Sequence, residues 1–206
     1  MNLVAWLQTW QELGASGGDD GLRRRIIACW SEPHRHYHTL QHLRECLAQF
    51  EGVHHKARHP GEVALALWFH DAFYDPQRDD NEARSADWAR DSVVAAGLAD
   101  DIADRVHSLV MMTRHGEAVA TDLDSQLLVD IDLSIFGADA RRFDESCEQV
   151  RREYVHVPDD DYREGRTEIL RGFLTRPKLY HTRYFSSLLE QRARANLQRE
   201  LDRLAG

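Results

Sequence analysis

Apolar residues recur along the chain at steps of three and four positions, which is the period of an amphipathic α-helix. Residues 3–14, for example, place Leu3, Trp6, Trp10 and Leu13 on one face. Hardly any stretch alternates between apolar and polar residues as a half-buried strand would. The pattern therefore predicts an all-α protein. Helices are expected over about residues 3–14, 22–30, 39–50, 60–71, 79–96, 99–113, 123–136, 139–155, 160–175 and 182–204.

The length and charge of the chain narrow its class. A chain of 206 residues with 42% hydrophobic residues suits one domain with a sizeable core. A formal net charge of -9 argues against a general nucleic-acid surface, since phosphate backbones are bound by concentrated Lys and Arg. A small phosphorylated ligand needs only a local positive site or a metal, so it remains compatible with this charge.

The three cysteines are widely spaced, and the chain contains no CxxC motif. They are therefore expected to be reduced thiols in a cytoplasmic protein. The first ten residues lack a basic region followed by a long apolar run, and no segment is long enough for a membrane span. We expect no membrane partner. The long C-terminal helix could pack within the domain or across a homodimer.

The candidate chemistry begins where the apolar run Val63–Phe69 meets the doublet His70-Asp71. A buried charge is costly unless it is paired or binds a metal. His38 lies upstream, and Asp132 lies downstream. Imidazole and carboxylate donors together suit manganese, iron, cobalt, nickel or zinc, and magnesium is a further candidate. We therefore expect a divalent metal at His38, His70, Asp71 and Asp132.

Helix geometry favours Asp132 over its neighbour Asp130 as the downstream ligand. At about 100° per residue the two aspartates lie about 160° apart around a helix axis. Asp132 lies within the apolar stripe, whereas Asp130 is expected to be a cap, a surface residue or a supporting carboxylate. Asp75 follows Asp71 by four residues, so the two share a face if the helix continues that far. Asp75 is then either a general base beside the catalytic Asp71 or a cap of the turn before Pro76.

His38, His70-Asp71 and Asp132 match the H…HD…D signature, and the chain resembles the HD superfamily of metal-dependent phosphohydrolases. The likeness is closer to a small bacterial branch of predicted phosphohydrolases and extends from about residue 30 to the C-terminus. The resemblance implies a single HD-type helical bundle over residues 1–206 with additional N- and C-terminal helices. Its metal-site core would cover about 34–137 and a helical extension about 138–206. The likeness also rests on Arg35–His38, Trp68–Ala72, Asp80–Glu82, Asp130–Gly137 and Val157–Asp160.

The function expected from these residues is hydrolysis of a phosphate ester or anhydride in a small metabolite, with a nucleotide as the favoured class. Arg35, Arg114 and His115 are the predicted phosphate contacts, although both arginines could be surface residues in ordinary ion pairs. Several HD nucleotidases have a glutamate where this chain has Tyr74, which leaves the substrate open. The alternative is a regulatory protein that binds a metal and a nucleotide in the same pocket without turnover.

His34, His36 and His42 cluster near His38 in the sequence. One of them could contact phosphate or a second metal. Exposed or hydrogen-bonded histidines of no special role are the simpler interpretation, so none of the three is predicted as a ligand.

Overall fold

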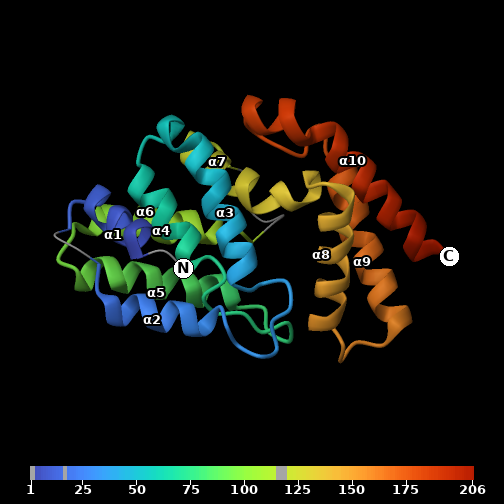
Figure 1. Ribbon diagram of the computed structural model, residues 1–206, viewed down its shortest axis with the longest axis horizontal. Helices are drawn as coiled ribbons and strands as arrows, with labels where there is room; N and C mark the ends of the chain where they lie inside the picture. The colour runs from blue at the N-terminus through green and yellow to red at the C-terminus, as the bar shows by residue number, and fades with distance from the viewer. Residues whose placement is uncertain (1–2, 16–17, 115–119) are drawn as a thin grey trace. The chain divides into compact units, whose positions relative to one another are not determined.

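The protein is all-helical, as the hydrophobic pattern predicts (Figure 1). The structure is a computed structural model that describes residues 3–15, 18–114 and 120–206, and these residues contain ten α-helices and no strand. None of the described helices combines the length and the apolar character that crossing a bilayer requires. The internal contacts divide the chain into two compact units, Met1–Ile131 and Asp132–Gly206.

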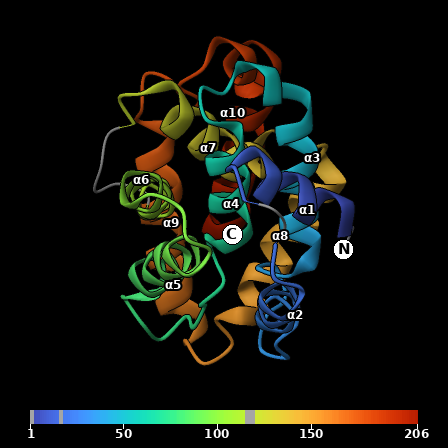
Figure 2. The ribbon, with the colours of Figure 1, turned by 90° about the vertical axis from the view of Figure 1, so that its left-hand side faces the viewer.

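The first unit is built around a helix that is buried on all sides. This helix, α4 (Pro60–Phe69), has nine buried residues and packs against α1, α3, α5 and α6. In Figure 2 it lies between α5 and α6 on one side and α1 and α3 on the other. Its central place explains why its sequence is a continuous apolar run instead of an amphipathic stripe. The surrounding helices are α1 (Leu3–Glu12), α2 (Asp20–Cys29), α3 (Leu40–Val53), α5 (Asn81–Ala95), α6 (Asp100–Met111) and α7 (Leu123–Asp132).

Two features fix α4 at the centre of this unit. Glu62, in its first turn, is buried and accepts hydrogen bonds from the Arg105 guanidinium of α6 at 2.7–3.1 Å. Gly61 lies so close to α1 that a Cβ atom would meet the backbone of Glu12 at 2.9 Å. A short 3₁₀ helix, η1 (His54–Lys56), follows α3. The apolar residues of α4 therefore form the core, and its last turn delivers His70 into the interior.

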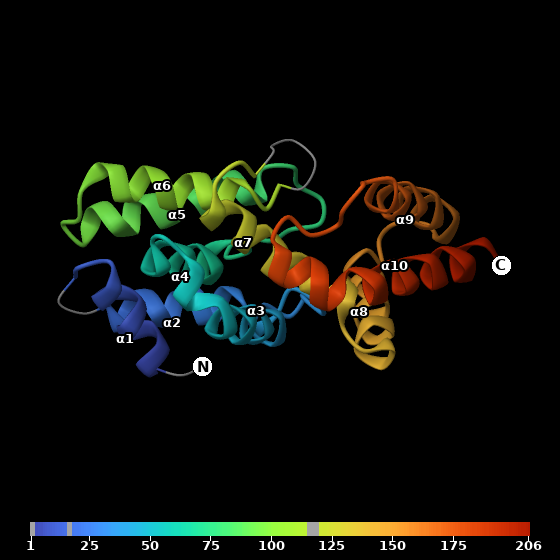
Figure 3. The same ribbon diagram turned by 90° about the horizontal axis from the view of Figure 1, so that it is seen from above.

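The second unit comprises the 3₁₀ helix η2 (Leu133–Gly137), α8 (Ala140–Glu153), α9 (Asp159–Leu174) and α10 (Arg183–Ala205). Helix α10 packs against η2, α8 and α9, and in Figure 3 it passes between the last two. Asn196 of α10 donates to the carbonyl oxygens of Phe136 and Ala138 at 2.8 and 2.9 Å. A Cβ atom at Gly137 would meet Leu189 Cβ at 2.6 Å, so a glycine is needed where α10 crosses η2.

Candidate metal site

His70 is the buried anchor of the site. It follows the last residue of α4, and only 1% of its surface is exposed. Its Nδ1 lies 2.8 Å from the carbonyl oxygen of Leu67. A carbonyl oxygen can only accept, so Nδ1 carries the proton and Nε2 of the neutral ring carries the lone pair. A backbone bond of this kind is what orients metal-binding histidines in proteins.

His42 faces His70 from α3. The Thr39 side chain caps this helix by accepting from the Gln41 N–H at 3.2 Å, which places His42 in the first turn. The ring is 97% buried, and its Nε2 lies 3.2 Å from Nε2 of His70. Two imidazole nitrogens approach this closely only with a proton or a cation between them, because facing lone pairs repel.

Asp71 adds a carboxylate to this pair. Its Oδ2 lies 3.2 Å from Nε2 of His70 and 3.8 Å from Nε2 of His42. Nitrogen ligands at about 2.0–2.1 Å from one tetrahedral zinc ion lie about 3.3–3.4 Å apart. The three donor atoms therefore have the mutual spacing that a single metal ion requires.

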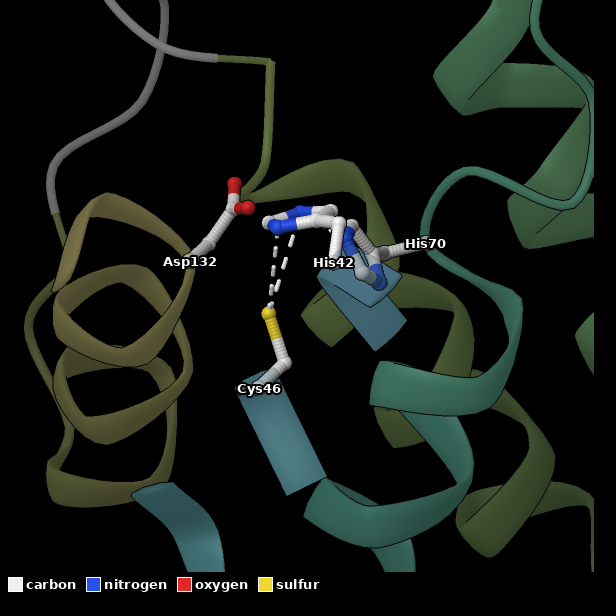
Figure 4. Close-up of side chains that lie close together, drawn as sticks. All are labelled: His42, Cys46, His70 and Asp132. Atoms are coloured by element: carbon white, nitrogen blue, oxygen red, sulfur yellow. Dashed lines mark hydrogen bonds between the residues drawn. The ribbon is translucent and has the colours of Figure 1, made fainter. Parts of the chain in front are cut away.

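Cys46 and Asp132 complete what we call the donor cluster: His42, Cys46, His70 and Asp132, together with the adjoining Asp71 (Figure 4). One ligand atom from each of the first four residues lies within 4.8 Å of the others, so this group could hold a metal ion. Asp132 is the last residue of α7, whose other residues belong to the first unit. The imidazoles and the thiol are buried, while Asp132 and Asp71 are half-buried. Asp130, two positions earlier, is fully buried in α7 and is not in this group.

The donor cluster contains His42, which the sequence did not predict as a ligand, and the group of four does not include His38. A ligand role for His38 stays a prediction. His38 precedes the N-cap of α3, is half-buried, and stacks its ring on Tyr74 at a centroid distance of 4.0 Å. His42 lies one helical turn further on, where the side chain points at α4. The sequence does carry a signal for this. His42, Cys46, Phe50 and Val53 follow one another at helical spacing, and all four are buried.

The Asp75 side chain caps a turn, and its role as a general base stays a prediction. Helix α4 ends at Phe69, so Asp71 and Asp75 do not share a helix face. The Asp75 carboxylate accepts from the Gln77 N–H at 2.9 Å, and its backbone exchanges hydrogen bonds with the Asn81 side chain at 2.8 and 3.1 Å. The structure thus places Asp75 as a cap of the turn around Pro76, which is the alternative that the sequence left open.

Arg35 is a buried structural residue and not a free phosphate contact. Its guanidinium donates to the carbonyl oxygens of Asp71 at 2.6 Å and Ala72 at 3.0 Å, and to that of His38 at 3.3 Å. Its Nε donates to Glu32 at 2.9 Å. The sequence-based role in phosphate binding is corrected accordingly, because these donors hold the segment after α4 in place.

Arg114, the second predicted phosphate contact, is not in the donor cluster. Arg114 is half-buried just after α6, and its backbone N–H donates to the Met111 carbonyl at 3.2 Å. Its contact with substrate stays a prediction. His115 lies outside the described residues.

Comparisons of the chain with protein-family models, with curated proteins and with solved structures gave no match. The resemblance to the HD superfamily therefore rests on the residues named above.

Proposed function

We propose that the protein is a metal-dependent phosphohydrolase of the HD type that acts on a small phosphorylated metabolite, with a nucleotide as the favoured class. The observation that carries the proposal is the convergence of His42 Nε2, His70 Nε2 and Asp71 Oδ2 within 3.8 Å of one another. The order of His70-Asp71 and Asp132 in the sequence supports the same family.

The residues that would hold the metal are His42, His70, Asp71 and Asp132. Their imidazole nitrogens and carboxylate oxygens suit a borderline divalent cation. Such a cation would also neutralise the two carboxylates, which are costly to bury as charges. A divalent cation in this position lowers the pKa of a coordinated water and withdraws charge from phosphoryl oxygens.

The protein's own groups determine the orientation of the site and its access. The Leu67 carbonyl fixes the His70 ring, and the Arg35 guanidinium fixes the backbone of Asp71. The carboxylates of Asp71 and Asp132 are half-buried, while the imidazoles and the thiol are buried. We therefore expect a phosphorylated substrate to meet a carboxylate before it meets the imidazoles.

Elemental analysis of the purified protein beside a His70→Ala/Asp71→Ala double variant tests the metal. The matched control is His107→Ala/Asp87→Ala, because this second His–Asp pair, at 3.4 Å, lies outside the donor cluster. We expect about one equivalent of a divalent metal in the wild type and the control, and its loss in the site variant. Absence of metal from all three, also after reconstitution, would overturn the proposal.

Phosphatase assays then test the chemistry. Metal-free protein is compared with reconstituted protein on p-nitrophenyl phosphate and on nucleoside mono-, di- and triphosphates. We expect phosphate release only after reconstitution, and none from the Asp71→Ala variant with its fold intact. Hydrolysis by a verified metal-free sample would refute the mechanism. Tight binding of a nucleotide without product would instead support a regulatory protein.

A further inference from the structure

Cys46 brings a third kind of donor atom to the cluster. It lies four residues after His42 in α3, which places both side chains on the same helix face. Its surface is 1% exposed, and its Sγ lies 3.7 Å from both Nδ1 and Nε2 of His42. Figure 4 shows the sulfur pointing toward the His42 ring. The sulfur therefore faces an imidazole of the metal site from inside the protein.

The separation of the sulfur from His42 Nε2 is close to that of two ligands of one metal ion. Zinc with sulfur at about 2.3 Å and nitrogen at about 2.0–2.1 Å separates these two ligands by about 3.5–3.6 Å in a tetrahedral site. The measured separation of Cys46 Sγ and His42 Nε2 is 3.7 Å. Because Sγ is equally far from both ring nitrogens, it faces the ring and not the Nε2 lone pair, so sharing one ion with Nε2 requires a turn of the Cys46 or the His42 side chain.

We propose that Cys46 is a metal ligand in its thiolate form and that the site consequently selects a thiophilic divalent cation of the zinc and cobalt class over magnesium or manganese. Soft sulfur ligands favour zinc, whereas sites made of oxygen ligands suit magnesium and manganese. Binding replaces the thiol proton by the metal and releases that proton to solvent. This inference rests on the metal site of the proposed function but not on phosphate hydrolysis.

A buried cysteine is often only a small apolar residue of the core. What distinguishes Cys46 is its surroundings, because its Sγ lies within 4.8 Å of ligand atoms of His42, His70 and Asp132. Cys147 of α8 is buried to the same degree, at 2% exposure, but is not part of the donor cluster. Cys147 therefore serves as a buried cysteine with which Cys46 can be compared in the same protein.

The test is titration of metal-free protein with Co²⁺, followed by near-ultraviolet absorption and by competition with a chelator. A cobalt–thiolate bond gives a charge-transfer band that nitrogen and oxygen ligands do not give. The variants are Cys46→Ser and Cys46→Ala, and the control is Cys29→Ser/Cys147→Ser, which leaves Cys46 as the sole cysteine. Affinities for Zn²⁺ and Mn²⁺ are measured on the same samples.

We expect the band in the wild type and in the control. Both Cys46 variants should lose it together with roughly 100-fold or more in Zn²⁺ affinity, while their affinity for Mn²⁺ changes much less. The band in the control decides the assignment even where the Cys46 variants fail to fold. Tight Co²⁺ binding without the band would overturn this inference and leave the proposed function intact. Absence of Co²⁺ and Zn²⁺ binding would overturn both.

Discussion

Replacement of Arg35 by methionine should weaken metal binding although Arg35 is not in the donor cluster. Its guanidinium lies between the segment before α3 and the segment after α4, and it donates to the carbonyl oxygens of Asp71 and Ala72. The side chain is fully buried, and its partner Glu32 is half-exposed. Methionine keeps much of the side chain's length and apolar stem but removes every donor.

The expected magnitude follows from the groups that lose a partner. The carbonyl oxygens of Asp71 and Ala72 would lose donors at 2.6 and 3.0 Å, and that of His38 would lose a longer bond at 3.3 Å. At about 1–3 kcal/mol for each of the two shorter bonds, we expect the free energy of unfolding to fall by about 2–6 kcal/mol. Because Asp71 is then held less firmly beside His70, metal affinity should fall roughly 10–100-fold, as for other residues that support metal ligands.

Two measurements separate these effects. Urea unfolding of metal-free protein gives the change in stability without the contribution of bound metal. Competition with a chelator gives the change in Zn²⁺ affinity. Arg194→Met is the matched control, because Arg194 also donates to one carboxylate, that of Glu190, and to two backbone carbonyls, those of Leu174 and Arg176. The control should lose stability and keep its Zn²⁺ affinity.

An Arg35→Met protein that binds Zn²⁺ as tightly as the wild type would refute this role of Arg35. An equal loss of affinity in Arg194→Met would also refute it, because the effect would then come from general destabilisation. Arg35→Lys should lie between the wild type and Arg35→Met, since an ammonium group keeps the charge but cannot bond both carbonyls through a planar fork.

Two further predictions concern single side chains. His42→Ala should lower Zn²⁺ affinity roughly 100-fold or more, while His38→Ala should change it far less. Isothermal titration of both variants measures this, and a larger loss of affinity in His38→Ala than in His42→Ala would contradict the site. Burial raises the pKa of the Cys147 thiol from about 9 to about 11. The Cys147 thiol of the unfolded chain therefore ionises at a lower pH than that of the folded chain. The free energy of unfolding consequently falls as the pH rises from 9 to 11. Urea unfolding at several pH values across this window should show that the free energy of unfolding of the wild type falls by up to about 2–3 kcal/mol more than that of Cys147→Ala. If the free energies of the two proteins fell in parallel with pH, the raised pKa of Cys147 would be contradicted.

The helical architecture can be predicted from the amino-acid sequence alone, because helical periodicity is a local property of the chain. Ten helices were expected, and the described residues contain ten α-helices with boundaries close to those expected. The largest difference is at the end of the 123–136 stretch, where α7 gives way to the 3₁₀ helix η2 at Leu133. The apolar run Val63–Phe69 also marked the central helix, since only a helix covered on all sides is apolar throughout.

Only the tertiary structure could decide which side chains meet. The approach of His42 to His70 depends on where α3 begins, because a shift of one helical turn would move the His42 ring to another environment. The position of Asp75 depends on where α4 ends, because a helix face continues only as far as the helix does.

The role of Arg35 depends on contacts between segments that lie 36 and 37 residues apart in the sequence. A local pattern cannot show whether a guanidinium meets solvent, substrate or the backbone of another segment. Cys46 is a similar case, since the sequence places it one helical turn after His42, and only the packing of α3 against α4 brings this pair to His70. The chain's periodicity thus determines its helices, and their packing determines its chemistry.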